Sequence, residues 1–73
     1  MANAQCVRLG KRVRELRMSR GWRQIDLAAH SGINKTMISD LERGQRDFCL
    51  QTLHALAAAL DTCPSDLLKA VGL

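Results

Sequence analysis

Residues 24–43, QIDLAAHSGINKTMISDLER, constrain the fold more than any other stretch of the chain. Read at the helical period, the stretch divides into two short amphipathic pieces that meet at Gly32. Leu27 lies on the apolar side of the first piece, and Ile38 and Leu41 lie on that of the second. Glycine tolerates the positive φ that a tight turn between helices requires. The pattern therefore predicts a helix-turn-helix whose second helix keeps a polar face free.

The start of the second helix carries signals of its own. Asn34 is a good N-cap, because its side-chain oxygen can accept a hydrogen bond from the first helical turn. Ile33 precedes this cap and can pack against Ile38, four positions into the helix. Ala28 is small where the two helices would cross, so the helix axes can approach closely.

Composition places the chain among small helical domains. The 73 residues suffice for one domain, and hydrophobic residues make up 47% of them but aromatic residues only 3%, which favours a compact all-α bundle. The sequence contains no apolar run of 18 residues and no apolar leader core, so we expect a cytoplasmic location. Three cysteines and two histidines show no metal-ligand spacing. We therefore expect no metal and no cofactor, reduced thiols and no enzyme, since the chain also lacks a nucleophile–base pair and a phosphate-binding glycine loop.

Positive charge is concentrated in the first third of the chain. Residues 1–23 hold seven basic side chains and one acid, whereas residues 24–73 hold four basic and six acidic side chains, within a net charge of +4. A lopsided basic surface points to a polyanion, of which nucleic acid is the commonest. Charge alone fits a solvated, salt-bridged helix face equally well.

Three further helices are expected around the helix-turn-helix, over 5–20, 50–60 and 64–71. Gly21 ends the first of these helices, and Pro64 is suited to the first position of the last. Arg17 lies at the edge of the first helix's apolar stripe, where a charge needs a partner, and Glu42 is the natural candidate.

These residues together resemble a known family. Gln24, Leu27-Ala28, Gly32-Ile33, Ile38-Ser39, Leu41-Glu42 and Gly44 are similar to the helix-turn-helix of the Xre family, the lambdoid phage repressor and Cro type. The resemblance extends over about nine-tenths of the chain and implies a compact five-helix, DNA-binding domain spanning residues 1–73. It implies a partly buried ion pair between Arg17 and Glu42, with a phosphate contact by Arg17 as a secondary interpretation. It also marks two departures: Arg23 stands at a usual Ser, Thr or Asn cap, and Asp61 stands at a usual Gly.

The second helix of the motif, expected at 35–43, is predicted to enter the major groove and to read bases. The base contacts that we predict are Lys35, Thr36, Ser39 and Asp40. Lys35 could donate to guanine, Thr36 could pack on a thymine methyl, and Asp40 could accept from a cytosine amine. A carboxylate facing phosphates is repelled, so orientation of Lys35 or Arg43 by Asp40 is an equal alternative.

Backbone contacts are predicted around this helix. The candidates for phosphate contact are Arg23, Gln24, Asn34, Arg43 and Arg46. The cation at Arg23, beside a helix N-terminus, would be explained by an arriving DNA phosphate, and Gln24 resembles the family's phosphate-contacting glutamine. Such contacts position a protein on DNA without reading its sequence.

The apolar C-terminal residues predict self-association. Leu67 and Leu68 point about 100° apart, so one can face the core while the other stays exposed. Leu68, Val71 and Leu73 are therefore the predicted dimer interface. The function that we expect is a homodimeric, sequence-specific transcriptional regulator bound to double-stranded DNA at a palindromic operator, with no membrane or small-molecule partner. The alternatives are an antitoxin or other protein-interaction module, and a helical hairpin that binds no ligand.

Overall fold

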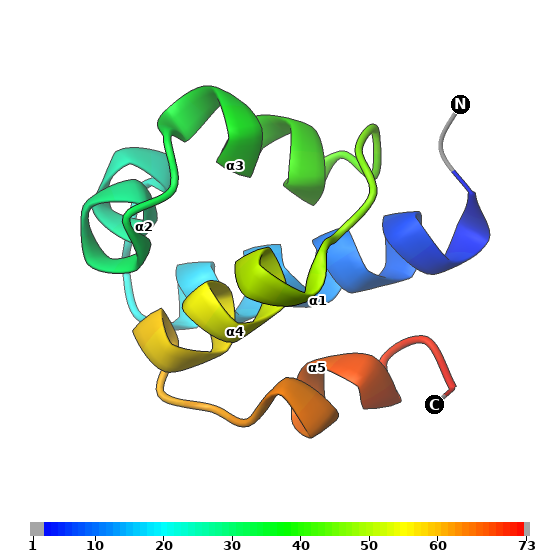
Figure 1. Cartoon of the computed structure of the whole chain (residues 1–73). Coiled ribbons are helices and arrows are strands. Elements are labelled where there is room, and N and C mark those ends of the chain that lie inside the picture. The colour runs from blue at the N-terminus through cyan, green and yellow to red at the C-terminus, as the bar shows by residue number, and fades with distance from the viewer. Residues whose placement is uncertain (1–2, 73) are drawn as a thin grey trace.

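The computed structural model describes residues 3–72, and over these residues the chain is all-α, as expected (Figure 1). Its helices are α1 (Ala4–Ser19), α2 (Gln24–Ser31), α3 (Lys35–Glu42), α4 (Leu50–Ala59) and α5 (Pro64–Lys69). The four helix ranges predicted outside α2 are correct to within about two residues at each end, and α2 begins at Gln24, where the motif was expected to begin.

Local capping groups explain where the helices start and stop. The side chain of Asn3 accepts a hydrogen bond from the backbone N–H of Cys6 at the start of α1. At the end of α1, the N–H groups of Gly21 and Trp22 bond back to the carbonyls of Met18 and Arg17, which closes the helix in a Schellman motif. Gly21 adopts the left-handed conformation there, with φ of 70°, as a C-terminal glycine was predicted to do.

The same closure at the end of α4 uses a residue other than glycine. The N–H of Asp61 bonds to the carbonyl of Ala58 and that of Thr62 to the carbonyl of Ala57, while Asp61 takes a φ of 54°. An L-residue in this conformation brings its Cβ close to the backbone, which glycine avoids. Asp61, which stands where the resemblance expects a glycine, therefore takes the conformation that glycine would take.

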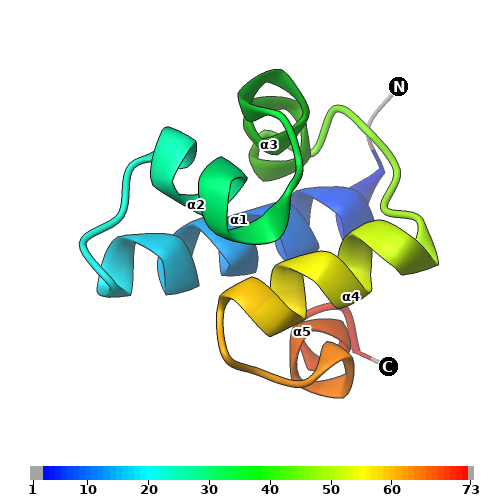
Figure 2. The ribbon, with the colours of Figure 1, turned by 60° about the vertical axis from the view of Figure 1, so that its left-hand side comes forward.

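The helices pack around one apolar core. α3 contacts α1 and α2, α4 contacts α2 and α5, and α5 contacts α1, so α3 lies on the side of the bundle away from α5 (Figure 2). The buried apolar residues are Leu9, Val13, Leu27, Ile38, Leu41, Leu53, Leu56, Ala57, Leu60, Leu67 and Val71. Within residues 3–72, no helix has the length and apolarity needed to cross a membrane.

An unexpected close approach fixes α3 against α1. A Cβ placed on Gly10, in the middle of α1, would lie 2.1 Å from the carbonyl oxygen of Leu41 and 2.9 Å from that of Glu42. No side chain fits in that space, so α1 and the end of α3 touch backbone to backbone. The close crossing expected at Ala28 concerned α2 and α3, and the approach of α1 to α3 at Gly10 was not predicted.

The C-terminal prediction needs a correction. Leu67 is fully buried and Leu68 is half-buried, as one inward and one outward leucine require. Val71, however, is only 7% exposed, because it packs into the core, so it has little surface to offer a partner. Leu73 lies outside the described residues.

Candidate nucleic-acid interface

α3 presents a polar face away from the core. Ile38 and Leu41 are each 1% exposed and anchor the helix, whereas Lys35 and Thr36 in its first turn are exposed. Ser39, one turn further on, is half-buried. Figure 1 shows α3 at the edge of the molecule, with α2 beside it and α1 beneath it. The first turn of α3 is thus the part of the helix most accessible to a groove of duplex DNA.

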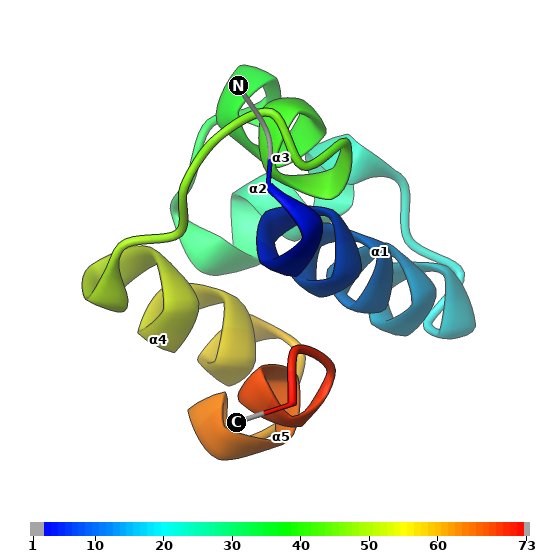
Figure 3. The ribbon, with the colours of Figure 1, turned by 90° about the vertical axis from the view of Figure 1, so that its right-hand side faces the viewer.

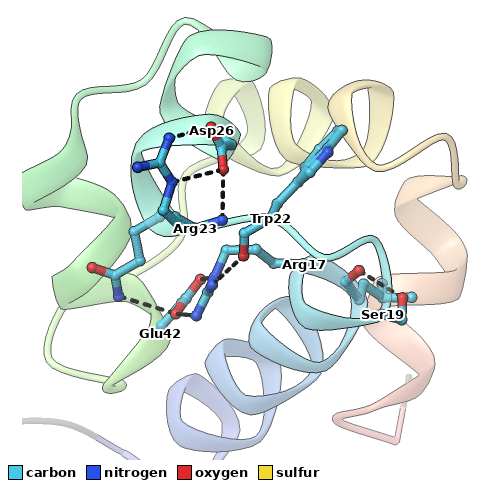
Figure 4. Close-up of polar contacts among 8 residues, drawn as sticks. Arg17, Ser19, Trp22, Arg23, Asp26 and Glu42 are labelled. Atoms are coloured by element: carbon cyan, nitrogen blue, oxygen red, sulfur yellow. Dashed lines mark hydrogen bonds and ion pairs between the residues drawn. The ribbon is translucent and has the colours of Figure 1, made fainter.

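The predicted ion pair joins α3 to α1. Arg17 Nε and Nη2 donate to Glu42 Oε2 and Oε1 at 2.7 and 3.0 Å, a bidentate arrangement (Figure 4). Arg17 Nη1 donates to the carbonyl oxygen of Trp22 at 2.6 Å. The Glu42 side chain is only 2% exposed and that of Arg17 10%, so both charges are nearly removed from water. This geometry makes the pair a structural link between α1, α3 and the loop before α2.

Gln24 takes part in the same network. Its Nε2 donates to Glu42 Oε1 at 3.1 Å, and its side chain is half-buried. The interpretation of Gln24 as a phosphate ligand alone therefore missed a second role, which is to satisfy the buried carboxylate of Glu42. An amide nitrogen carries two donor hydrogens, so one remains for another acceptor.

A shallow groove of about 250 Å³ opens beside this network. It is lined by Arg14, Arg17, Gln24, Ser39, Glu42 and Arg43. Arg14 was not among the residues predicted from the sequence to contact DNA, yet it lines this groove. The signal available was its spacing, since Arg14 lies one turn before Arg17 and so shares a helix face with it.

The N-terminus of α2 departs from expectation. Asp26 Oδ2 accepts a hydrogen bond from the backbone N–H of Arg23 at 2.8 Å, and the Arg23 guanidinium donates to both oxygens of Asp26 at 3.3 Å (Figure 4). The hydrogen bonds from Arg23 lower the pKa of the Asp26 carboxyl below its ordinary value. The cation at Arg23 thus has a partner within the chain, so an arriving DNA phosphate is not needed to explain its place at this helix N-terminus, and the phosphate contact stays a prediction. The Arg23 side chain nevertheless remains 79% exposed.

The N-terminus of α3 is capped as predicted. Asn34 Oδ1 accepts a hydrogen bond from the backbone N–H of Met37 at 2.8 Å. The amide nitrogen of Asn34 has no role in that cap and lies at an exposed position beside the first turn. Met37 and Ile33 are half-buried and pack against the core, which agrees with the packing role predicted for Ile33.

Asp40 engages two arginines. Its Oδ1 accepts from Arg43 Nη2 at 2.8 Å, and its Oδ2 accepts from Arg46 Nη2 at 3.5 Å. Of the two roles left open for Asp40, a direct contact therefore supports the orientation of Arg43. The contact with Arg46 was not predicted. Lys35 is not a partner of Asp40 in the described ion pairs.

Trp22 has a packing role rather than an exposed stacking surface. Its ring packs against the core and stacks on that of His30, with the centroids 4.2 Å apart and the planes 5° from parallel. The Arg20 guanidinium lies 5.2 Å from the Trp22 centroid. Trp22 therefore contributes to packing just before α2.

A hydrogen bond joins the loop after α3 to α1. Cys6 Sγ donates to Asp47 Oδ1 at 3.2 Å, and desolvation together with this carboxylate raises the pKa of the Cys6 thiol. Cys6, Cys49 and Cys63 are all free thiols. Within residues 3–72, His, Cys, Asp and Glu side chains form no group that could hold a metal ion.

Comparison with known proteins identifies the family. A family model described as helix-turn-helix matches residues 13–68, which is more than half of the chain and includes α2, α3 and the Arg17–Glu42 pair. This chain belongs to the Xre-like helix-turn-helix family. The resemblance stated from the motif residues is thereby confirmed.

The relatives of this helix-turn-helix chain are regulators by name. It is 42% identical over 65 residues to the HTH-type transcriptional regulator DdrOP3 of Deinococcus deserti, a match that covers 89% of this chain but 50% of that protein. It is 36% identical over 69 residues to the control protein C.BamHI of Bacillus amyloliquefaciens, covering 93% of this chain and 85% of that protein. The chain thus spans about half the length of DdrOP3 and most of the length of C.BamHI.

Solved structures of other proteins share this fold. The restriction-modification controller protein C.AhdI of Aeromonas hydrophila superposes with a TM-score of 0.86 at 42% identity, covering 89% of this chain and 98% of that chain. C.Esp1396I, solved as a tetramer in complex with its natural 35 base-pair operator, shares the fold with a TM-score of 0.82 at 23% identity, over 97% of this chain and 99% of that chain.

Proposed function

We propose that this chain is a sequence-specific, double-stranded DNA-binding transcriptional regulator. It binds a palindromic operator as a homodimer and inserts α3 into the major groove. The observation that carries the proposal is the exposed first turn of α3, with Lys35 and Thr36 projecting from a helix that Ile38 and Leu41 anchor in the core. The names of DdrOP3 and C.BamHI, a transcriptional regulator and a control protein, support it.

Base reading is assigned to the outward side chains of α3. Lys35 donates to the O6 and N7 acceptors of guanine, and the methyl group of Thr36 packs on that of thymine. Ser39, half-buried one turn later, contacts a base only where the helix enters deeply. The close backbone contact at Gly10 and the Arg17–Glu42 pair keep α3 rigid, so these side chains meet the groove at a fixed depth.

Phosphate contacts surround the reading helix. Arg23, Arg43 and Arg46 keep 79%, 58% and 49% of their side chains exposed, so each can reach a phosphate despite its ion pair. Asn34 and Gln24 each retain an amide hydrogen beyond the bonds described, and these hydrogens can be donated to the DNA backbone. Arg14 joins this set from α1, because it lines the groove that Gln24 and Arg43 also line.

Two copies of the domain are joined near α5. Leu68 is the residue that carries this proposal, since it is half-buried beside the inward-facing Leu67 and Val71. A two-fold dimer presents two α3 helices, and helix-turn-helix dimers space their half-sites about 34–36 Å, one helical turn, apart. Within the same fold, the operator complex of C.Esp1396I is a precedent for binding by a multimer.

Selection of bound duplexes from a random DNA pool, at stated salt concentrations, tests this proposal. The expected result is an inverted repeat whose two halves are centred about one helical turn apart. The affinity for that sequence should exceed the affinity for random DNA by about 10³-fold or more. Failure to enrich any sequence, or failure to bind duplexes even at low salt, contradicts the proposed function.

A further inference from the structure

A carboxylate lies among the groups that are proposed to meet DNA phosphates. Asp40 projects from the last turn of α3, 24% exposed, between the guanidinium groups of Arg43 and Arg46. The other acids nearby are engaged elsewhere: Glu42 is buried against Arg17, and Asp47 accepts from Cys6. An acid here repels DNA, so its presence requires a compensating effect.

The two contacts of Asp40 join segments of different rigidity. Arg43 caps the C-terminal end of α3, and its Nη2 lies 2.8 Å from Asp40 Oδ1. Arg46 belongs to the loop after α3, and its Nη2 lies 3.5 Å from Asp40 Oδ2. The carboxylate therefore links a loop cation to the helix, while both arginines keep about half of their side chains exposed.

Arginine carries large rotamer freedom that binding must remove, so holding the side chain in place beforehand favours a complex of defined geometry. The same carboxylate reduces the net charge of this surface, and thereby weakens binding that depends on charge alone. Ordering of the arginines strengthens binding to a matched site, whereas the lower surface charge weakens binding to random DNA. Together, the two effects raise the preference for a matched site over random DNA.

We propose that Asp40 is a positioning residue that orders Arg43 and Arg46 for the operator backbone and suppresses sequence-independent DNA binding. It raises the ratio of operator affinity to random-DNA affinity through the arginines rather than by reading a base. This inference rests on the proposed function, which it deepens.

Replacement of Asp40 tests the proposal with the full chain. Exposed ion pairs contribute little to folding stability, so Asp40→Asn is expected to fold, and its thermal melt verifies this. Affinities of wild type and variant are measured for the selected operator and for a scrambled duplex over a range of salt. Asp61→Asn is the matched control, because it makes the same charge change in the α4–α5 turn, on the opposite side of the molecule from α3 (Figure 3).

For Asp40→Asn, scrambled-duplex affinity should rise about 3- to 10-fold, with a steeper salt dependence, because one repulsive charge is gone. Operator affinity should fall relative to scrambled-duplex affinity by about 10-fold or more, because two arginines must now be ordered on binding. Asp40→Glu should restore part of this ratio. In the Arg43→Ala/Arg46→Ala background, Asp40→Asn should leave the ratio unchanged.

Three results overturn this inference while leaving the proposed function intact. The first is an unchanged ratio for Asp40→Asn on wild-type arginines. The second is the same change from Asp61→Asn. The third is that Asp40→Asn loses a preference at one base pair and does so equally in the Arg43→Ala/Arg46→Ala background. Asp40 would then read a base directly. Wild type that binds no duplex overturns both this inference and the proposed function.

Discussion

At the scale of single residues, two features of the fold are unfavourable in themselves, and both depend on the residues around them. Arg17 and Glu42 bring full charges to nearly dry positions, where each is tolerated only because the other is in hydrogen-bond contact. Asp61 holds a left-handed backbone at a helix end that usually takes glycine. Both features were predictable, since Arg17 lay at the edge of an apolar stripe and Asp61 at a family glycine position. The help that Glu42 receives from Gln24 was not, because it depends on the packing of α2 against α3.

Glu42→Ala should destabilise the fold by about 3–5 kcal/mol, because it leaves the Arg17 guanidinium buried without its partner. Replacing both residues by apolar ones of similar volume, Arg17→Met with Glu42→Leu, should recover most of that loss, since no buried charge remains. Urea denaturation measures the free energy of unfolding of each variant. A single variant as stable as wild type would show that the pair does not support α3.

Asp61→Gly should stabilise the chain by about 0.5–1 kcal/mol, because relief of the left-handed strain exceeds the added freedom of glycine in the unfolded state. Gly21→Ala is the matched control: a Cβ there meets no atom within 4 Å, so only the backbone conformation changes. It should destabilise the chain by about 1 kcal/mol. Thermal melts of both variants and wild type test this prediction. A melting temperature of Asp61→Gly below that of wild type contradicts it.

At the scale of helices, the ends of elements follow from nearby residues, whereas their contacts do not. The Asn34 cap, the Gly21 closure and Pro64 at the first turn of α5 act within a few positions of themselves, so the sequence predicted them. Gly10 acts on α3, far along the chain, and its only sequence signal was a glycine beside Leu9 in an otherwise regular helix. The link from Asp40 to Arg46 was missed for the same reason, since it depends on the path of a loop.

Gly10→Ala should destabilise the fold by about 1–3 kcal/mol, because the new methyl group pushes α1 away from the carbonyls of Leu41 and Glu42. Helix propensity alone would make Gly10→Ala more stable by about 1 kcal/mol, so any loss of stability must come from the steric clash. Lys11→Ala, at an exposed position of the same helix, should change stability by less than about 0.5 kcal/mol. Urea denaturation measures the free energy of unfolding of both variants. A Gly10→Ala variant more stable than wild type would contradict the close approach of α1 to α3.

At the scale of the whole molecule, a domain of 26 × 24 × 21 Å is small beside an operator with two half-sites. In the proposed dimer, a second copy of the chain would add a second α3, and two weak contacts would become one bivalent contact. The sequence predicted this self-association from apolar residues near the C-terminus, but it could not tell that Val71 points into the core. Leu68, which is half-buried, is the residue of that predicted interface that keeps surface for a partner.

Leu68→Ser should weaken self-association, so that sedimentation equilibrium reports the 8.1 kDa monomer at concentrations where wild type has twice that mass. Removing exposed apolar area from an interface lowers its affinity, whereas the fold loses only the partial packing of one side chain. Ile25→Ser is the matched control on α2, because Ile25 is 53% exposed. Equal association of wild type and Leu68→Ser would place the dimer contact elsewhere.

The most direct test of the central claim, that the core holds the first turn of α3 outward to read duplex DNA, compares Lys35→Ala with Arg46→Ala. Both variants are titrated with the selected operator and with a scrambled duplex at several salt concentrations. Lys35→Ala should lose about 1–3 kcal/mol of binding free energy on the operator and little on the scrambled duplex. Arg46→Ala should weaken both and reduce the salt slope by about one. Equal losses on the two duplexes for Lys35→Ala would contradict the assignment of α3 as the reading helix.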